Sequence, residues 1–221
     1  MGYLEALLEG AAEIGLSVTP ELAARLAQHQ ALVVRWASKM NLTTVVDPEE
    51  AARLHGLDSL LIAELVDPAD TSRAVDVGSG AGFPGLVVAL ARPALRMRLL
   101  EPARKRASFL RVALADLRRP DVTVEEGRLD SLPPGARPPW DADLILSRAT
   151  IPPLELIPTA APYLAPGGRL VLTSGAGAPP IEAIRAAAAA AGLIHLERVS
   201  RRLPRGESRV LDLLGPKSET R

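Results

Sequence analysis

The pattern with the clearest chemical meaning is the stretch 74–85, which reads AVDVGSGAGFPG. It opens with Val75 and Val77, which favour a β-strand. The glycines that follow allow positive φ angles and let the backbone approach a ligand without a Cβ in the way. A helix beginning near Pro84 would direct unpaired N–H groups toward a ligand above the strand ends. The stretch therefore predicts a loop that binds a nucleotide-containing cofactor.

This loop fits two classes of cofactor. Residues 80–85 match the GxGxxG pattern of dinucleotide-binding proteins, and Glu101 lies about 20 positions after Gly80, where a carboxylate reaches a ribose hydroxyl. NAD and S-adenosylmethionine both carry that ribose. Asp76 favours the second, because a carboxylate there would repel a pyrophosphate and attract the α-ammonium group of S-adenosylmethionine. We therefore expect S-adenosylmethionine, and a Gly-rich turn without a ligand is the weaker alternative. The expected contacts are Asp76, Gly78, Gly80, Gly82 and Glu101.

Composition limits the class of protein. The 221 residues are 48% hydrophobic, and 26 basic residues balance 26 acidic ones. One main core is expected, and any nucleic-acid binding must come from a local basic face. With no cysteine and three histidines, we expect no disulfide, no thiol nucleophile and no metal site. The N-terminus does not resemble a secretory signal, and the longest uncharged apolar run, 186–193, is too short to span a membrane. We expect a cytoplasmic monomer.

Helical patterns occupy the first 70 residues. Apolar residues recur at helical spacing over 3–16, Thr19 and Pro20 signal the start of a helix over 20–40, and Asp47-Pro48 opens a third helix that ends near residue 65. We expect 1–70 to form a helical cap packed on the main domain, 71–215 to form that domain, and 216–221 to be a flexible tail.

From residue 71 onward, strands alternate with helices. Strands are expected at 74–77, 96–101, 122–127, 143–149 and 169–173, and a closing antiparallel hairpin at 193–199 and 208–214. Such alternation requires a parallel sheet with right-handed crossovers. The expected fold class is α/β, a Rossmann-like seven-stranded sheet of the S-adenosylmethionine-dependent methyltransferase type with helices on both faces and one antiparallel strand near an edge. Function inferred from that topology is an analogy.

A basic turn opens the helix expected after Glu101. Arg104, Lys105 and Arg106 place positive charge near a helix N-terminus, where it opposes the helix dipole. Stability therefore does not explain these residues. A phosphate-rich partner such as RNA would explain them, and a solvated helix face is the alternative.

Two further pairs of residues lie at the carboxyl ends of predicted strands. Leu129 and Asp130 come after the third strand, where a carboxylate or a backbone N–H could meet an adenine edge, although Asp130 could equally be an N-cap. Ser147 and Arg148 end the fourth strand. Arg148 could hold a phosphate or the cofactor carboxylate, or it could form an ion pair with an acid such as Asp76.

Five segments carry a resemblance to a known family when they are taken together. They are Trp36 with Asn41-Leu42-Thr43, His55-Gly56-Leu57-Asp58-Ser59, the loop 76–85, Lys105-Arg106 with Phe109-Leu110, and Ser147-Arg148-Ala149. Over most of 36–175 the chain resembles the RsmG, or glucose-inhibited division protein B, methyltransferases of bacteria. These enzymes methylate N7 of a guanine in small-subunit ribosomal RNA.

The resemblance implies roles for individual residues. Gly78 and Phe83 would contact the cofactor, Glu101 would hold its ribose, and Leu129 and Asp130 would frame its adenine, with Arg148 lining the same site.

The residues that the resemblance places toward the RNA have structural alternatives. His55, Asp58 and Ser59 would face the RNA or support the site, or they could be packing residues. Asn41 could face RNA or cap a helix. Two positions depart from the family pattern, because Leu54 and Ser174 stand where a positive charge is common.

The implied reaction needs few catalytic groups. Guanine N7 carries a lone pair and no proton, so no general base is required, and catalysis reduces to positioning and to stabilising the positive charge that moves onto the purine. We expect Arg148 and Ser147 to hold the splayed-out base by its O6 or by an adjacent phosphate. The substrate would be small-subunit ribosomal RNA or the 30S particle.

Three other functions are weighed against this interpretation. They are a methyltransferase for another RNA or a small molecule, an NAD-dependent oxidoreductase, and a non-catalytic cofactor-binding regulator. The oxidoreductase would need a residue pair for hydride transfer, such as Tyr and Lys, and neither Tyr3 nor Tyr163 has a suitable partner.

Overall fold

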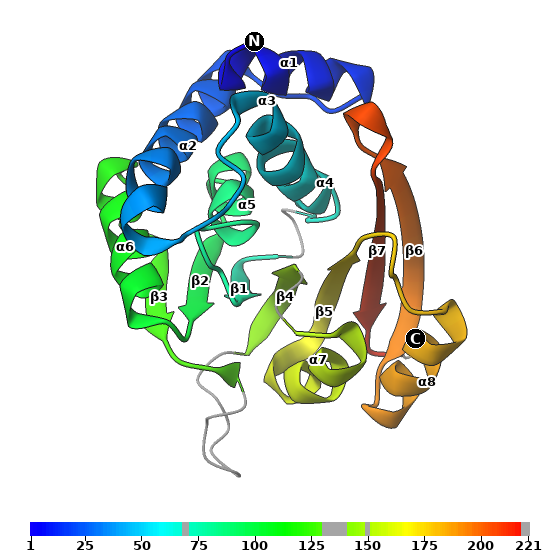
Figure 1. The fold of residues 1–221 in the computed structure, drawn as a ribbon. Helices are drawn as coiled ribbons and strands as arrows, with labels where there is room; N and C mark the ends of the chain where they lie inside the picture. The colour runs from blue at the N-terminus through cyan, green and yellow to red at the C-terminus, as the bar shows by residue number, and fades with distance from the viewer. Residues whose placement is uncertain (68–70, 130–140, 149–150, 218–221) are drawn as a thin grey trace.

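The computed structural model describes residues 1–67, 71–129, 141–148 and 151–217, and its centre is a seven-stranded sheet (Figure 1). The strand order is β3-β2-β1-β4-β5-β7-β6, and only β7 runs antiparallel to its neighbours. The predicted fold class is confirmed. The strands are β1 (Arg73–Val77), β2 (Arg96–Glu101), β3 (Thr123–Glu126), β4 (Ala142–Arg148), β5 (Leu164–Ser174), β6 (Ile194–Arg202) and β7 (Ser208–Gly215).

Helices cover both faces of the sheet. One face carries α4, α5 and α6, with the first two helices of the chain packed outside them, and the other face carries α7 and α8. The helices are α1 (Tyr3–Glu13), α2 (Pro20–Met40), α3 (Pro48–Ala51), α4 (Asp58–Glu64), α5 (Gly85–Ala91), α6 (Arg104–Asp116), α7 (Pro153–Ala160) and α8 (Ile181–Ala190). Three short turns complete the described elements: the π-helical η1 (Ala52–Leu57) and the 3₁₀-helical η3 (Ala161–Tyr163) and η4 (Pro204–Gly206).

The N-terminal helices begin where the sequence signals them. The Thr19 hydroxyl accepts a hydrogen bond from the Leu22 N–H at 3.2 Å, and the Asp47 carboxylate accepts one from the Glu50 N–H at 2.9 Å. Both side chains satisfy a backbone donor that the first helical turn leaves open.

The third predicted helix contains a π-helical turn that the sequence pattern does not indicate. From Pro48 to Glu64 the chain is helical, but η1 interrupts the α-helical hydrogen bonding. At Gly56 the chain lies so close to α1 that a Cβ would be 2.6 Å from Leu7 Cδ1 and 2.7 Å from the Tyr3 hydroxyl. Turns of this kind often occur at functional sites, and η1 carries His55.

The N-terminal helices share a core with the sheet. Leu7 of α1, Leu26 of α2 and Leu60 of α4 belong to the same apolar cluster as Leu86 of α5 and Leu99 of β2. The division of the chain at residue 70 stays a prediction.

The turn between β6 and β7 reaches the N-terminal helices, as the position of its end beside α1 shows (Figure 1). Arg205 forms an ion pair with Glu49, and Arg53 forms one with Glu207. These contacts join the antiparallel strand to the N-terminal helices. Among the described helices, none combines the length and apolar character that crossing a membrane requires.

Candidate functional site

The glycine loop joins β1 to α5, as predicted. Gly78, Gly80 and Gly82 have φ angles of 75°, 57° and 93°, which residues with a Cβ adopt at a cost. At Gly82 a Cβ would also lie 3.0 Å from His29 Nε2. The loop therefore requires glycine both for its conformation and for its packing against α2.

Asp76 is fully buried beneath the loop. Its Oδ2 accepts a hydrogen bond from the Gly85 N–H at 3.0 Å, and Oδ1 has no hydrogen-bond partner within the described part of the chain. Burial raises the pKa of Asp76 to about 7. A buried carboxylate oxygen without a partner fits a site that receives a cationic group.

Glu101 ties the loop to the next helix. Its Oε2 accepts a hydrogen bond from the Gly80 N–H at 2.8 Å, and its Oε1 accepts one from the Ala103 N–H at 2.9 Å. The side chain of Arg106 lies 3.9 Å from the same carboxylate. Carboxylate oxygens accept more than one hydrogen bond, so Glu101 keeps acceptor capacity for a hydroxyl.

A small cavity lies at the carboxyl ends of β1 and β2. We call it the strand-end cavity; its volume is about 180 Å³, and it is lined by Val77, Gly78, Leu100, Pro102, Gly127, Arg128, Leu129, Ile151, Glu155 and Thr159. The backbone carbonyl of Leu129 is held by the Tyr163 hydroxyl at 2.6 Å. Asp130, predicted beside the adenine, lies outside the described residues.

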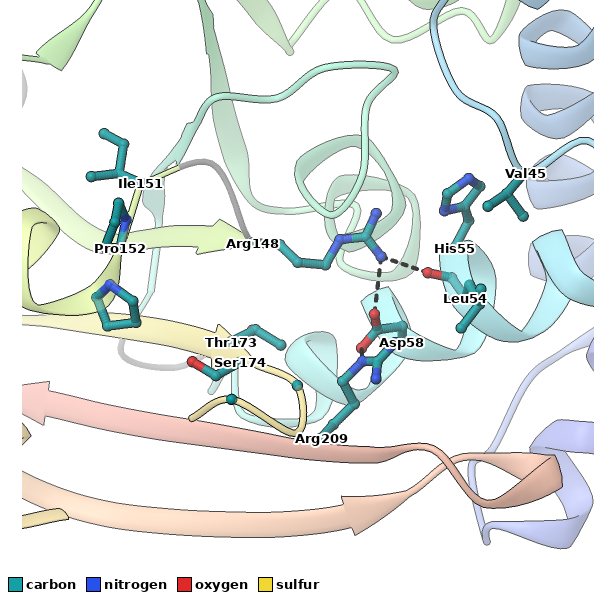
Figure 2. A pocket seen from close by; sticks show the side chains of 13 residues that line it. Val45, Leu54, His55, Asp58, Arg148, Ile151, Pro152, Thr173, Ser174 and Arg209 are labelled. Carbon is teal, nitrogen blue, oxygen red and sulfur yellow. Dashed lines mark hydrogen bonds and ion pairs between the residues drawn. The ribbon is translucent and has the colours of Figure 1, made fainter. Parts of the chain in front are cut away.

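A larger cavity shares the lining residue Ile151 with the strand-end cavity. This arginine cavity has a volume of about 660 Å³ (Figure 2). The segment between α2 and α3, the turn η1 and the start of α4 line one side, and β4, β5, β7 and the segment that leads into α7 line the other. The lining residues are Val45, Leu54, His55, Asp58, Arg148, Ile151, Pro152, Pro153, Thr173, Ser174, Gly175, Gly177 and Arg209.

Three charged side chains meet in the arginine cavity. Arg148 Nη1 lies 3.1 Å from Asp58 Oδ2 and donates to the Leu54 carbonyl at 2.7 Å. On the other side of the carboxylate, Arg209 Nε lies 3.0 Å from Asp58 Oδ1. Figure 2 shows the carboxylate between the two guanidinium groups. The ion pair considered for Arg148 thus exists, but its acid is Asp58 and not Asp76.

A stack of rings connects the arginine cavity with the glycine loop. Phe83 lies between His55, at 4.4 Å between ring centroids, and His29, at 4.7 Å. Arg148 sits over the same phenyl ring, with Cζ 5.8 Å from its centroid. The His29 Nε2 donates to the Ala81 carbonyl at 2.8 Å, so α2 holds the loop directly.

Both histidines of this stack are neutral at physiological pH. Burial lowers the pKa of His29 to about 4. Burial and the charge of Arg148 lower the pKa of His55 to about 4 as well. The His55 Nε2 is hydrogen-bonded to the Thr43 hydroxyl at 3.1 Å. A neutral imidazole thus lines the arginine cavity.

Ser147 has a different environment from its neighbour Arg148. Its buried hydroxyl donates to the Val77 carbonyl at 3.0 Å and lines neither cavity. This bond joins β4 to the end of β1. The predicted contact between Ser147 and a base stays a prediction.

The remaining predicted RNA contacts lie on the surface. Asn41 ends α2 with a φ of 50°, and its N–H donates to the Ala37 carbonyl at 3.0 Å, so it does end the helix as the structural alternative expects. Arg104, Lys105 and Arg106 are exposed on the first turn of α6. Pro102 places this basic turn at the border of the strand-end cavity.

Comparison with known proteins identifies the family. The family model described as rRNA small subunit methyltransferase G, GidB, matches residues 22–204. The chain belongs to the GidB family. It is 40% identical to the ribosomal RNA small subunit methyltransferase G of Anaeromyxobacter sp. over 196 residues, which cover 89% of this chain and 88% of that relative. The protein of the same name from Burkholderia pseudomallei is 36% identical over 174 residues, which cover 78% and 75% of the two chains.

Solved structures support the fold independently. The S-adenosylmethionine-dependent methyltransferase SibL matches with a TM-score of 0.61 at 15% identity over 97% of this chain and 74% of its own. A sarcosine dimethylglycine methyltransferase from Galdieria sulphuraria matches with a TM-score of 0.60 at 16% identity over 79% and 89%. Membership of the GidB family makes this chain a methyltransferase with S-adenosylmethionine as its methyl donor. The oxidoreductase alternative is therefore excluded.

Several residues of this GidB-family site have no motif in the sequence that places them there. They are Arg209, Thr173, His29 and Tyr163. Arg209 lies on the closing hairpin, far along the chain from every motif, and no local pattern marks it. His29 is part of the apolar face of α2, and its spacing there could have placed it against the sheet layer.

Proposed function

We propose that this protein transfers the methyl group of S-adenosylmethionine to N7 of a guanine in small-subunit ribosomal RNA. The observation that carries the proposal is that the strand-end cavity and the arginine cavity share a lining residue, Ile151. One cavity lies at the strand ends, where open α/β sheets bind their ligands. The other offers charged and polar groups to an acceptor. The names of the curated relatives supply the ribosomal RNA.

The residues around the glycine loop fit the methyl donor. Glu101 has acceptor capacity for ribose hydroxyls, and the unpaired Asp76 oxygen suits the ammonium group. Gly78 and Leu129 line the strand-end cavity beside the loop that carries Gly80, Gly82 and Phe83. The predicted role of Asp130 at the adenine remains part of the proposal.

The arginine cavity suits a reaction that moves no proton. Guanine N7 attacks through a lone pair, so the neutral His55 in the wall is not needed as a base. Arg148 can donate to the guanine O6 or to an adjacent phosphate. Ser147 would support this arrangement by fixing β4 against β1. The contribution of the site is therefore positioning and electrostatics.

RNA outside the cavities would contact the basic turn and the cavity rim. We assign contacts with RNA phosphates to Arg104, Lys105 and Arg106. Asn41 and His55 would contact the RNA at the rim of the cavity. Because ribosomal RNA is the substrate, we place the protein in the cytoplasm, where it would act as a monomer. Light scattering with and without 30S particles tests that oligomeric state.

The deciding experiment measures methyl transfer. Labelled S-adenosylmethionine is incubated with 30S particles and with naked ribosomal RNA from cells that lack the enzyme, and nucleosides are separated by mass spectrometry. Label in 7-methylguanosine supports the proposal, and preference for the particle shows that ribosomal proteins or RNA folding supply binding surface. Label in another nucleoside, or none despite bound S-adenosylhomocysteine, refutes it.

A further inference from the structure

Asp58 stands out as a buried acid that the reaction described above does not use. Its side chain is 3% exposed and lies between Arg148 and Arg209, at 3.1 and 3.0 Å. The three residues come from α4, β4 and β7, so distant parts of the chain converge on one carboxylate. Among the described lining residues of the arginine cavity, these three carry the formal charges. The wall of the arginine cavity, with two guanidinium groups and one carboxylate, therefore has a net charge of +1.

The charge of this wall matters because of how charge moves in the reaction. Methyl transfer forms a bond between N7 and the methyl carbon and breaks the carbon–sulfur bond, whose electron pair stays on sulfur. No proton is gained or lost, and the positive charge moves from the sulfonium to the purine. A purine that becomes cationic beside two unbalanced guanidinium groups would be repelled, and this repulsion would be stronger in the transition state than in the ground state.

We propose that Asp58 is the counter-charge of the arginine cavity, which lets Arg148 and Arg209 face the acceptor without opposing the cationic purine. The proposal rests on the proposed N7 chemistry. The net positive charge of the two arginines and one acid attracts anionic RNA, and the carboxylate offsets one guanidinium where the purine becomes charged.

The alternative is that Asp58 only joins three elements of the fold. The chain offers a matched control, because Asp212 is another buried acid between two basic side chains. Asp212 lies 2.8 Å from His195 Nε2 and 2.7 Å from Arg198 Nε, and it lines neither the strand-end nor the arginine cavity. Asp212→Asn therefore measures what the loss of a buried ion pair does without changing the charge of the cavity.

The test compares Asp58→Asn, Asp212→Asn and the double variant Asp58→Asn/Arg209→Gln on 30S particles. Asp58→Asn is expected to lower kcat by about tenfold or more, with KM for the particle unchanged or lower because the wall becomes more positive. The double variant restores the net charge of the wall, so its kcat should recover above that of Asp58→Asn. Asp212→Asn should lower the melting temperature and leave kcat unchanged. Titration with S-adenosylhomocysteine reports whether each variant retains its cofactor site.

Other outcomes overturn the inference. A wild-type kcat in Asp58→Asn, or a kcat that the second substitution lowers further, shows that charge balance is not what Asp58 contributes. If Asp58→Asn does not fold, the double variant is compared with wild type, whose wall has the same net charge, and a kcat in the double variant no higher than about a tenth of the wild-type value counts equally against the proposal. Absence of 7-methylguanosine with the wild-type protein would instead refute the proposed function.

Discussion

Replacing Asp76 by Asn should stabilise the cofactor-free protein at neutral pH and weaken its binding of the cofactor. The carboxylate is fully buried, and burial raises its pKa from 3.8 to about 7. The folded protein thus holds a proton that the unfolded chain releases above its ordinary pKa. The stability associated with that proton is present below pH 3.8 and is lost as pH rises through about 7.

The size of the effect follows from the shift. A change of about three pKa units corresponds to about 4 kcal/mol, which is an upper limit for this group. Asn is isosteric and can still accept the Gly85 N–H, but it carries no charge at any pH. Relative to wild type, the free energy of unfolding of Asp76→Asn should therefore rise by up to about 4 kcal/mol between pH 4 and pH 8. Contributions from other groups are common to both proteins and cancel in the difference.

The assay is urea denaturation of both proteins across this pH range, combined with calorimetric titration of S-adenosylhomocysteine. Wild-type affinity should rise with pH, because the ammonium group binds best to the ionised carboxylate and binding releases a proton. Asp76→Asn should bind about tenfold or more weakly, without proton release. Parallel stability curves for the two proteins, together with equal affinities, would refute this account of Asp76.

Three further predictions follow from individual contacts. Arg148→Ala should abolish methyl transfer and leave the fold intact, because it removes the guanidinium from the arginine cavity. Wild-type activity of this variant in the labelled-methyl transfer assay would take Arg148 out of the site. Gly85→Ala should lower the free energy of unfolding by about 1–3 kcal/mol, since its Cβ would lie 2.4 Å from Asp76 Oδ2, and an unchanged melting temperature would contradict this packing. His29→Asn should make the stability of the protein less sensitive to acid. Burial lowers the pKa of His29 to about 4, so the contribution of the neutral ring to the free energy of unfolding is present above about pH 6.5 and is lost as pH falls toward 4. Identical acid unfolding of the variant and wild type would argue against burial of the ring.

Much of the scaffold was predictable because its signals are local. Helix starts at Thr19 and Asp47 depend on side chains that bond to backbone groups three residues away. The alternation of strands and helices indicated the parallel sheet, and the hairpin pattern over 193–214 indicated its antiparallel strand. Positive φ angles at Gly78 and Gly80 are requirements of the loop itself. Signals of this kind depend on residues close in sequence, so they can be recognised without knowledge of the fold.

The contact partners of the site residues were harder to predict from the sequence. Arg148 was considered a partner of an acid such as Asp76, but it pairs with Asp58, 90 positions away. Arg209 on the last strand was not assigned to the site at all. The π-helical turn η1 was also missed, because the sequence of 48–64 has an uninterrupted helical pattern and the close contact with α1 at Gly56 is long-range.

The glycine loop and the acid at the end of the second strand could be inferred from the sequence, because both depend on backbone conformation or on spacing along one strand–helix–strand unit. The class of cofactor followed from the charge of Asp76 within the same unit. The set of charges that meet in the arginine cavity follows from the packing of the whole chain. Asp58, Arg148 and Arg209 arrive there from three elements, and their pairing depends on how the N-terminal helices pack across the ends of the strands. Such packing is set by the whole core, so residues distant in sequence become neighbours only when the chain has folded.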